Sequence, residues 1–254
     1  MKKSKLLFLV ISILSYNIGS SQIDLSVYDD IESVTVTSYW GDINVIGTEA
    51  SADRVFTMEV VHTDSENNAV RLDQIEGYVD LSVENKQLYI ETRTPEGFES
   101  IDLNLKIPAH LFLDLKLIKG GNIYADNLKN GVEINILNGS VKIERIGKYA
   151  LVNAANGEIS AEFENIDSDK PVSLVTMNGG ITVSLPGNIK RDVRMISRKN
   201  GYIQSDFPLA SGDKISLNTK QYSKTPIIHT ARINGGGALL FLSTENGPLS
   251  IKKS

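Results

Sequence analysis

The feature that most constrains the fold is a short motif that recurs along the second half of the chain. A glycine, in four of five cases preceded by asparagine, is followed two residues later by isoleucine or valine. The glycines are separated by steps of 18, 18, 22 and 22 residues: Gly121, Gly139, Gly157, Gly179 and Gly201. A repeat of this length is typical of stacked supersecondary units, which bury their apolar faces against one another.

Each step of the repeat has room for two short strands joined by turns. The second and fourth residues after each glycine are mostly apolar, and this period of two places them on one face of a strand. We expect that face to point inward, with one buried column formed by Ile123, Val141, Ile159, Ile181 and Ile203.

The first half of the chain also alternates between apolar and polar residues, as half-buried strands do. The alternating segments are 31–39, 55–61, 78–83, 88–92 and 101–107. The sequence therefore predicts an all-β protein with a β-rich N-terminal half.

Two all-β architectures fit the repeat. In a β-solenoid, each step is one coil, neighbouring coils pair in parallel, and the Asn-Gly turns stack into a column. In an antiparallel β-meander, each Asn-Gly is a tight hairpin turn. The recurrence of the same residue classes at the same place in every step favours the solenoid, because stacked coils require it and hairpins do not.

The chain resembles the bacterial DUF4097 family of β-strand-repeat proteins, which are called putative adhesins. The resemblance covers roughly residues 31–251 and is carried by Gly41-Asp-Ile-Asn-Val-Ile-Gly47, by Ile101-Asp-Leu-Asn-Leu-Lys-Ile-Pro108, by 111–125 and by the Asn-Gly steps. It implies a right-handed β-helix-like fold and an envelope or surface location, and it supplies no active-site residues.

The N-terminus is typical of a secretory signal peptide. Three lysines precede the apolar-rich run Leu6–Leu14, and small residues follow at Gly19 and Ser21. We expect residues 1–21 to be removed, leaving a β-strand region over 22–118 and a repeat-built region over 119–254, both belonging to one continuous domain. The apolar run is too short to span a bilayer, so we expect no membrane insertion.

Composition excludes several kinds of chemistry. The chain has no cysteine, and therefore no disulfide, thiolate metal site or lipidated cysteine. Without the first three lysines, 23 basic residues face 31 acidic ones, and this net charge of −8 disfavours nucleic acid as a partner. His62, His110 and His229 lie far apart in sequence, so we expect no catalytic residues, no metal and no cofactor.

The asparagines and the single tryptophan have structural interpretations. Asn and Gly tolerate the left-handed backbone of tight turns, and stacked amides can hydrogen-bond from step to step. We expect this of Asn138, Asn156, Asn178 and Asn200. Trp40 ends an alternating strand in phase with its apolar residues, which favours core packing over a sugar-stacking platform.

One acidic column stands out on the outward face. Asp126, Glu144 and Glu162 occupy the fifth position after successive glycines. Carboxylates on strands about 4.8 Å apart repel by about 1 kcal/mol even in water. Lys129, Lys142 and Arg145 can neutralise them as surface pairs; a bound cation or a polysaccharide site is the functional alternative.

A basic segment is the second anomaly in this acidic protein. It contains Lys190, Arg191, Arg194, Arg198 and Lys199. We expect a solvated face or long turn. Arg194 and Arg198 fall in the phase of inward residues elsewhere, so either a one-residue bulge moves them outside or the coil opens there.

These observations predict an exported bacterial protein that acts as a non-enzymatic binding or structural module of the envelope. Its partner would be a macromolecule such as a cell-surface protein or glycan, and its location periplasmic, envelope-associated or extracellular. The alternative is a polysaccharide-acting enzyme, since β-helices host such enzymes.

Export generates the first test. Mass spectrometry of the protein from its host should show a chain that begins at or within a few residues of Gln22, because the small residues Gly19 and Ser21 suit signal peptidase. A chain that still begins at Met1 would contradict the prediction of export.

Overall fold

The computed structural model describes residues 20–26, 30–49, 56–64, 78–93, 98–166, 169–199, 201–208 and 226–254. Side chains are described for most of these residues, His62 being an exception. The predicted signal peptide falls mostly on residues 1–19, and Asn200 completes the asparagine series; both lie outside the described residues.

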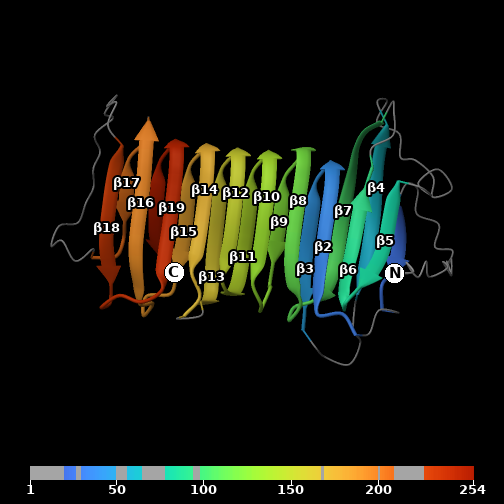
Figure 1. The fold of residues 1–254 in the computed structure, drawn as a ribbon, viewed down its shortest axis with the longest axis horizontal. Coiled ribbons are helices and arrows are strands. Elements are labelled where there is room, and N and C mark those ends of the chain that lie inside the picture. The colour runs from blue at the N-terminus through green and yellow to red at the C-terminus, as the bar shows by residue number, and fades with distance from the viewer. Residues whose placement is uncertain are drawn as a thin grey trace.

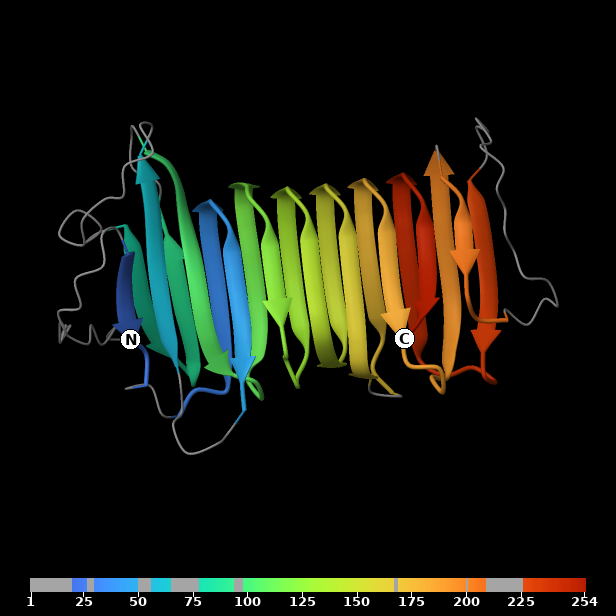
Figure 2. The same ribbon diagram turned by 180° about the vertical axis from the view of Figure 1, so that it is seen from behind.

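The fold is all-β, with two large mixed sheets and no helix in the described residues (Figures 1 and 2). Sheet A has the order β1(Ser20–Asp24), β4(Thr57–Asp64), β7(Phe98–Pro108), β3(Ile43–Thr48), β9(Ile123–Asp126), β11(Val141–Lys148), β13(Ile159–Ile166), β15(Ile181–Leu185), β20(Leu249–Lys253) and β17(Ile203–Ser205). Sheet B has the order β18(Ile227–Ile233), β16(Arg191–Lys199), β19(Leu239–Asn246), β14(Val172–Asn178), β12(Ala150–Asn156), β10(Val132–Asn138), β8(Phe112–Gly120), β2(Ser33–Trp40), β6(Gln87–Thr92) and β5(Val79–Glu84).

Successive strands of the repeat alternate between the two sheets. Strand β10 lies in sheet B and pairs in parallel with β12, whereas β11 lies in sheet A and pairs in parallel with β13. The Asn-Gly turn therefore connects two sheets and closes no hairpin, so the β-meander alternative is wrong for the repeat. We call each such pair of strands, one in each sheet, a rung. Antiparallel pairing occurs only among the outermost strands of the described sheets: β1–β4–β7, β5–β6 and β16–β18.

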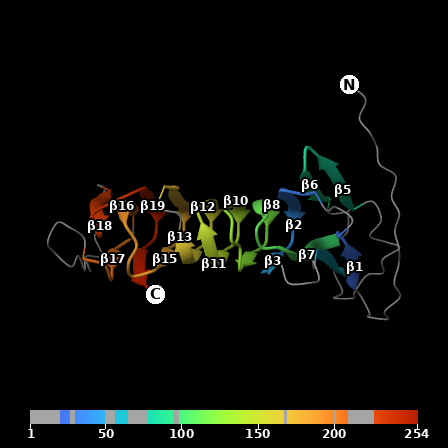
Figure 3. The ribbon, with the colours of Figure 1, turned by 90° about the horizontal axis from the view of Figure 1, so that it is seen from below.

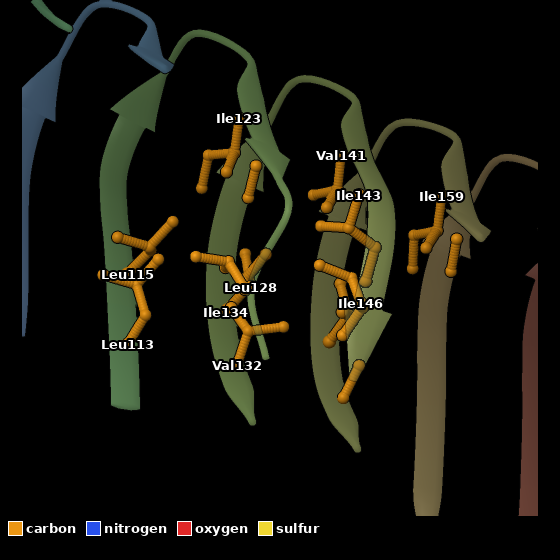
Figure 4. Packing of buried hydrophobic residues seen from close by; sticks show 14 of the residues in the cluster. Leu113, Leu115, Ile123, Leu128, Val132, Ile134, Val141, Ile143, Ile146 and Ile159 are labelled. Carbon is orange, nitrogen blue, oxygen red and sulfur yellow. The ribbon is translucent and has the colours of Figure 1, made fainter. Parts of the chain in front are cut away.

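The core lies between the two sheets, which form two layers along the whole stack (Figure 3). In Figure 4, Ile123, Val141 and Ile159 lie at the same level of successive rungs, and Leu115 and Ile134 extend from the facing sheet. All five side chains are buried. The period-two pattern after each glycine therefore identified the inward face correctly.

The order of the rungs differs from the order of the sequence. Strands β19 and β20, at the end of the chain, lie between the β14–β15 rung and the β16–β17 rung. Leu249 consequently separates Ile181 from Ile203 in the buried column. The expectation that Ile203 follows Ile181 directly was wrong, because every rung offers the same parallel strand edges and any rung can pair with any other.

The asparagine column predicted from the sequence is confirmed where the structure describes it. The Asn156 Nδ2 amide donates to Asn138 Oδ1 at 2.8 Å, and Asn178 Nδ2 donates to Asn156 Oδ1 at 2.8 Å. Below them, Asn138 Nδ2 donates to the Lys119 carbonyl at 2.7 Å. The asparagine side chains thus link neighbouring rungs at the turn, as the backbone hydrogen bonds do along the strands.

A second, buried set of hydrogen bonds lies just inside the turns. The hydroxyls of Thr176 and Thr244 donate to the carbonyls of Gly157 and Gly179 at 3.0 and 2.8 Å. Burying a hydroxyl is costly unless it is hydrogen-bonded. The glycine carbonyl of the neighbouring rung satisfies that requirement.

No helix in the described part of the chain is long and apolar enough to span a membrane.

The buried column generates a stability test. Ile159→Asp should lower the free energy of unfolding by several kcal/mol, because it places a carboxylate between Val141 and Ile181 with no partner. Urea unfolding measures the change. Ser160→Asp, at the adjacent exposed position, is the control and should unfold near the wild-type midpoint. Equal midpoints for the two variants would contradict the burial of Ile159.

Candidate functional site

The outer face of sheet B carries a continuous row of apolar side chains, which we call the apolar stripe. Tyr39, Ile118, Leu137 and Met177 are 45%, 51%, 50% and 57% exposed, and half-buried Ala155 completes the row. Each residue is the last outward position of its strand before the turn. Five strands about 4.8 Å apart give the stripe a length of roughly 19 Å.

The register of sheet B brings the stripe together. Leu117 pairs with Ile136, which sets Ile118 beside Leu137. On β12 and β14, the inward residue before each stripe position and the asparagine after it are also in register. Parallel pairing without a slip therefore aligns one outward residue from each of β8, β10, β12 and β14. Tyr39 on β2 lies at a register shift between Ser38 and Trp40.

Amide side chains line both sides of the stripe. On one side lies the asparagine column of the turns, from Asn138 to Asn178, in which each asparagine comes directly after a stripe residue in the sequence. On the same face, two residues before the stripe, Asn153 Nδ2 donates to Asn135 Oδ1 at 3.3 Å. The middle of the surface is therefore apolar with uncharged donors and acceptors along its borders.

Charged groups lie at the two ends of the stripe. At the end near β19, Arg198 Nε donates to Glu245 Oε2 at 3.1 Å. At the other end, a shallow groove of about 330 Å³ is lined by Thr37, Tyr39, Glu91, Thr92, Arg93 and Ile118. Through Tyr39 and Ile118, this groove adjoins the stripe directly.

Trp40 does not belong to the core, contrary to expectation. It is half-buried, and the Lys119 Nζ lies 3.6 Å from the centre of its ring. The register of β2 against β8 shifts between Ser38 and Trp40, which takes the tryptophan out of the inward phase. A cation over the ring makes Trp40 unavailable as an open stacking platform.

The acidic column is only partly assembled. Asp126 and Glu144 are register partners on β9 and β11. A bulge after Ile143 then shifts β11 against β13, so Glu162 is not paired with Glu144. The left-handed backbone at Arg145, with φ of 49°, marks this bulge.

Asp126 is buried, whereas the sequence predicted an exposed carboxylate. The Arg145 guanidinium contacts it through two hydrogen bonds: Nε donates to Oδ1 at 2.8 Å, and Nη2 donates to Oδ2. The hydrogen bond to Asp126 raises the pKa of Arg145. The bulge turns Arg145 back onto the neighbouring strand, and this neutralises the buried carboxylate.

Glu144 has its own partners. Its carboxylate accepts hydrogen bonds from the Lys142 ammonium at 2.8 Å and the Tyr124 hydroxyl at 2.9 Å. These bonds lower the pKa of Glu144, the bond from Lys142 most strongly. Desolvation, with help from the bond to Glu144, raises the pKa of Tyr124 to about 12. The cluster therefore consists of hydrogen-bonded ion pairs.

No group of three histidine or carboxylate side chains in the described residues is arranged to hold a metal ion. His110 is exposed after β7, and His229 lies on β18 at one end of the stack.

The basic segment is divided between inside and outside. Arg191 is fully buried, and its Nη1 donates to the Lys170 carbonyl at 2.5 Å. Lys190, Arg194 and the pair Arg198 and Lys199 are exposed. The prediction of one solvated basic patch was therefore wrong for Arg191.

A one-residue offset of β16 explains the phase of its arginines. Lys199 occupies the position opposite Asn246 that asparagine holds in the other rungs. Val193, Met195 and Ser197 consequently point inward, and the arginines between and after them point outward. Arg194 and Arg198 therefore lie outside, as the first of the two alternatives predicted. The offset in register places them there, and the rung stays closed because β16 pairs with β19 along its length.

Sequence reasoning missed the apolar stripe. The signal was available: the residue before each turn asparagine is Leu137, Ala155 or Met177, apolar although its phase is outward. An apolar residue that breaks the inward–outward alternation at the same place in several repeats indicates an exposed surface with a partner.

The fold occurs in solved structures. A putative cell adhesion protein from Clostridium sporogenes is similar with a TM-score of 0.52 and 11% identity, over 94% of this chain and 100% of that chain. A putative adhesin from Bacteroides fragilis has a TM-score of 0.45 and 11% identity, over 94% and 98%. No family model matches the chain, so the DUF4097 resemblance stays a prediction. No curated protein matches it either. At these identities the likeness to the clostridial structure shows a shared all-β fold.

The Asp126–Arg145 pair generates a test. Asp126→Asn should lower the melting temperature by several degrees, because it removes the charged partner of Arg145 from a buried position. Glu162→Gln, an exposed carboxylate in the same outward phase, should leave it unchanged.

Calcium addition separates an ion pair from a cation site at the same residues. We expect the wild-type melting temperature to stay constant, since Arg145 and Lys142 already neutralise the carboxylates. A rise with calcium that Asp126→Asn abolishes would show that the column binds the ion.

Proposed function

We propose that the protein is an exported, non-enzymatic binding module of the bacterial envelope, adhesin-like in its role, and that the apolar stripe is its contact surface. The stripe carries the proposal. Exposed apolar side chains are ordinary when scattered, but a contiguous row indicates an interaction site. Leu137 and Met177 are half or more exposed on the flat face of a sheet, so their exposure needs a partner to account for it.

We also propose that the two sheets are the walls of a β-solenoid, right-handed as the family resemblance implies. The alternation of successive strands between sheets and the parallel pairing of each rung with the next support this. Such a scaffold is held by backbone hydrogen bonds on both sides of nearly every strand. It therefore keeps the stripe residues at fixed spacing before any ligand arrives, which reduces the ordering cost of binding.

The ligand class that fits the stripe is an uncharged glycan chain. Sugars present apolar C–H faces and hydroxyl edges, and the surface presents an apolar centre with amide borders at Asn135, Asn153 and the asparagine column. Tyr39 adds an aromatic ring at the groove, where a sugar ring can pack. A cell-surface protein is the other partner class, and the experiment below distinguishes the two.

The polysaccharide-acting enzyme is less well supported. Glycoside hydrolysis by the usual route needs two carboxylates about 5 to 9.5 Å apart across the scissile bond. Glu91 is the single carboxylate among the described residues that line the groove. Turnover is still measured with binding, because a product would decide between the two functions.

A panel of immobilised envelope glycans and envelope proteins tests the proposal, with sugar release followed in the same wells. We expect binding to an uncharged glycan without release. Leu137→Gln should weaken that binding about tenfold or more, as removal of a central apolar contact does. Ile46→Gln is the matched control: Ile46 is also apolar and 42% exposed, but it lies on the outer face of sheet A.

Three outcomes would contradict the proposal. Equal losses in Leu137→Gln and Ile46→Gln would place the contact elsewhere. Binding to envelope proteins alone would rule out a glycan as the ligand and leave the stripe as the proposed contact surface. Sugar release that Glu91→Gln abolishes would make the protein an enzyme.

A further inference from the structure

Charge is strongly polarised along the long axis of the molecule. The described residues up to 118 include 13 acidic and 4 basic side chains, and those from 186 onward include 3 acidic and 8 basic ones. The first group forms the strands at one end of the stack and the second forms those at the other end (Figure 1). A molecule of net negative charge thus has one basic end.

The same two ends carry strand edges. Among the described strands, β1 and β5 close sheets A and B at the acidic end, and β17 and β18 close them at the basic end. Each of these strands has a hydrogen-bonded neighbour on one side only in the described sheets. A free strand edge presents backbone N–H and C=O groups that can pair with another chain.

Apolar side chains are exposed at both ends as well. Val83 on β5 is 44% exposed, and Ile228 on β18 is 55% exposed. Around them, β5 carries Asp80 and Glu84, and β18 carries Arg232. Each end of sheet B therefore has an apolar residue beside charges, and the sign of the charges is opposite at the two ends.

We propose that a second copy of this chain docks end to end, with the basic end of one copy against the acidic end of the next. Complementary charge selects this orientation, because two acidic ends or two basic ends repel. Each end presents one edge of each sheet, so strands of one copy can pair with those of the next. The contact joins different surfaces of the two copies, and such contacts build open linear assemblies.

Sedimentation of the purified mature protein, expressed from Gln22 onward, tests the proposal. At about 20 mM salt we expect the average mass to grow with protein concentration without reaching a fixed oligomer. At about 500 mM salt the association should weaken about tenfold or more, because the screening length falls well below the size of the charged ends. A protein that stays monomeric at low salt and high concentration would overturn the proposal.

Charge reversal at one end at a time provides the specific test. Lys190→Glu with Arg194→Glu lowers the net charge of the described residues at the basic end from +5 to +1, and Glu84→Lys with Glu91→Lys changes that at the acidic end from −9 to −5; all four side chains are exposed. Each variant alone should associate more weakly than the wild type at low salt, because one of its two ends has lost charge complementary to the other. An equimolar mixture should associate more strongly than either variant alone, since the unchanged acidic end of one variant can meet the unchanged basic end of the other.

Glu158→Lys with Glu162→Lys reverses two exposed charges in the middle of the stack and serves as the control. It should assemble like the wild type. Loss of assembly in this control, or a mixture that stays monomeric, would show that the ends do not direct association. All of these readouts are independent of glycan binding, so the failure of either proposal leaves the other intact.

Discussion

The interaction on which the rest of the structure depends is the contact between glycines of neighbouring rungs. A Cβ added at Gly139 would lie 1.6 Å from the Gly121 carbonyl oxygen, and one at Gly157 would lie 1.9 Å from that of Gly139. Both glycines have φ above 130°, which side-chain-bearing residues rarely adopt. Because no other residue fits, the glycine column fixes the register of neighbouring rungs at these turns, and that register determines which of the next few side chains point inward.

This explains which parts of the fold the sequence could reveal. The turn glycine, the inward isoleucines and the asparagine column are local features that repeat in every rung, so Gly139, Val141 and Asn138 identify their own places. The order of the rungs is not a local feature. Leu249 and Ile203 offer the same apolar contact, and the sequence around them does not indicate that Leu249 is the one that lies next to Ile181.

The candidate site was less accessible to sequence reasoning for a related reason. A search for buried periodicity passes over outward residues, and the apolar stripe consists of outward residues. The acidic column failed differently: its three carboxylates share a sequence position, but the bulge at Arg145 breaks the register between β11 and β13. Spacing from the glycine therefore predicts which residues are neighbours over the first few positions of a strand. Beyond a bulge, the same spacing no longer identifies register partners.

A repetitive scaffold leaves two places where a sequence can differ without disturbing the core: the outward rows and the two ends. This chain uses both, with the stripe from Tyr39 to Met177 on one face and opposite charges at the ends. The two features reinforce each other geometrically, because the stripe runs along the same axis as the proposed assembly. End-to-end copies would align their stripes in one line. A long glycan could then contact several copies at once, and each further contact would form at the high effective concentration of a tethered ligand.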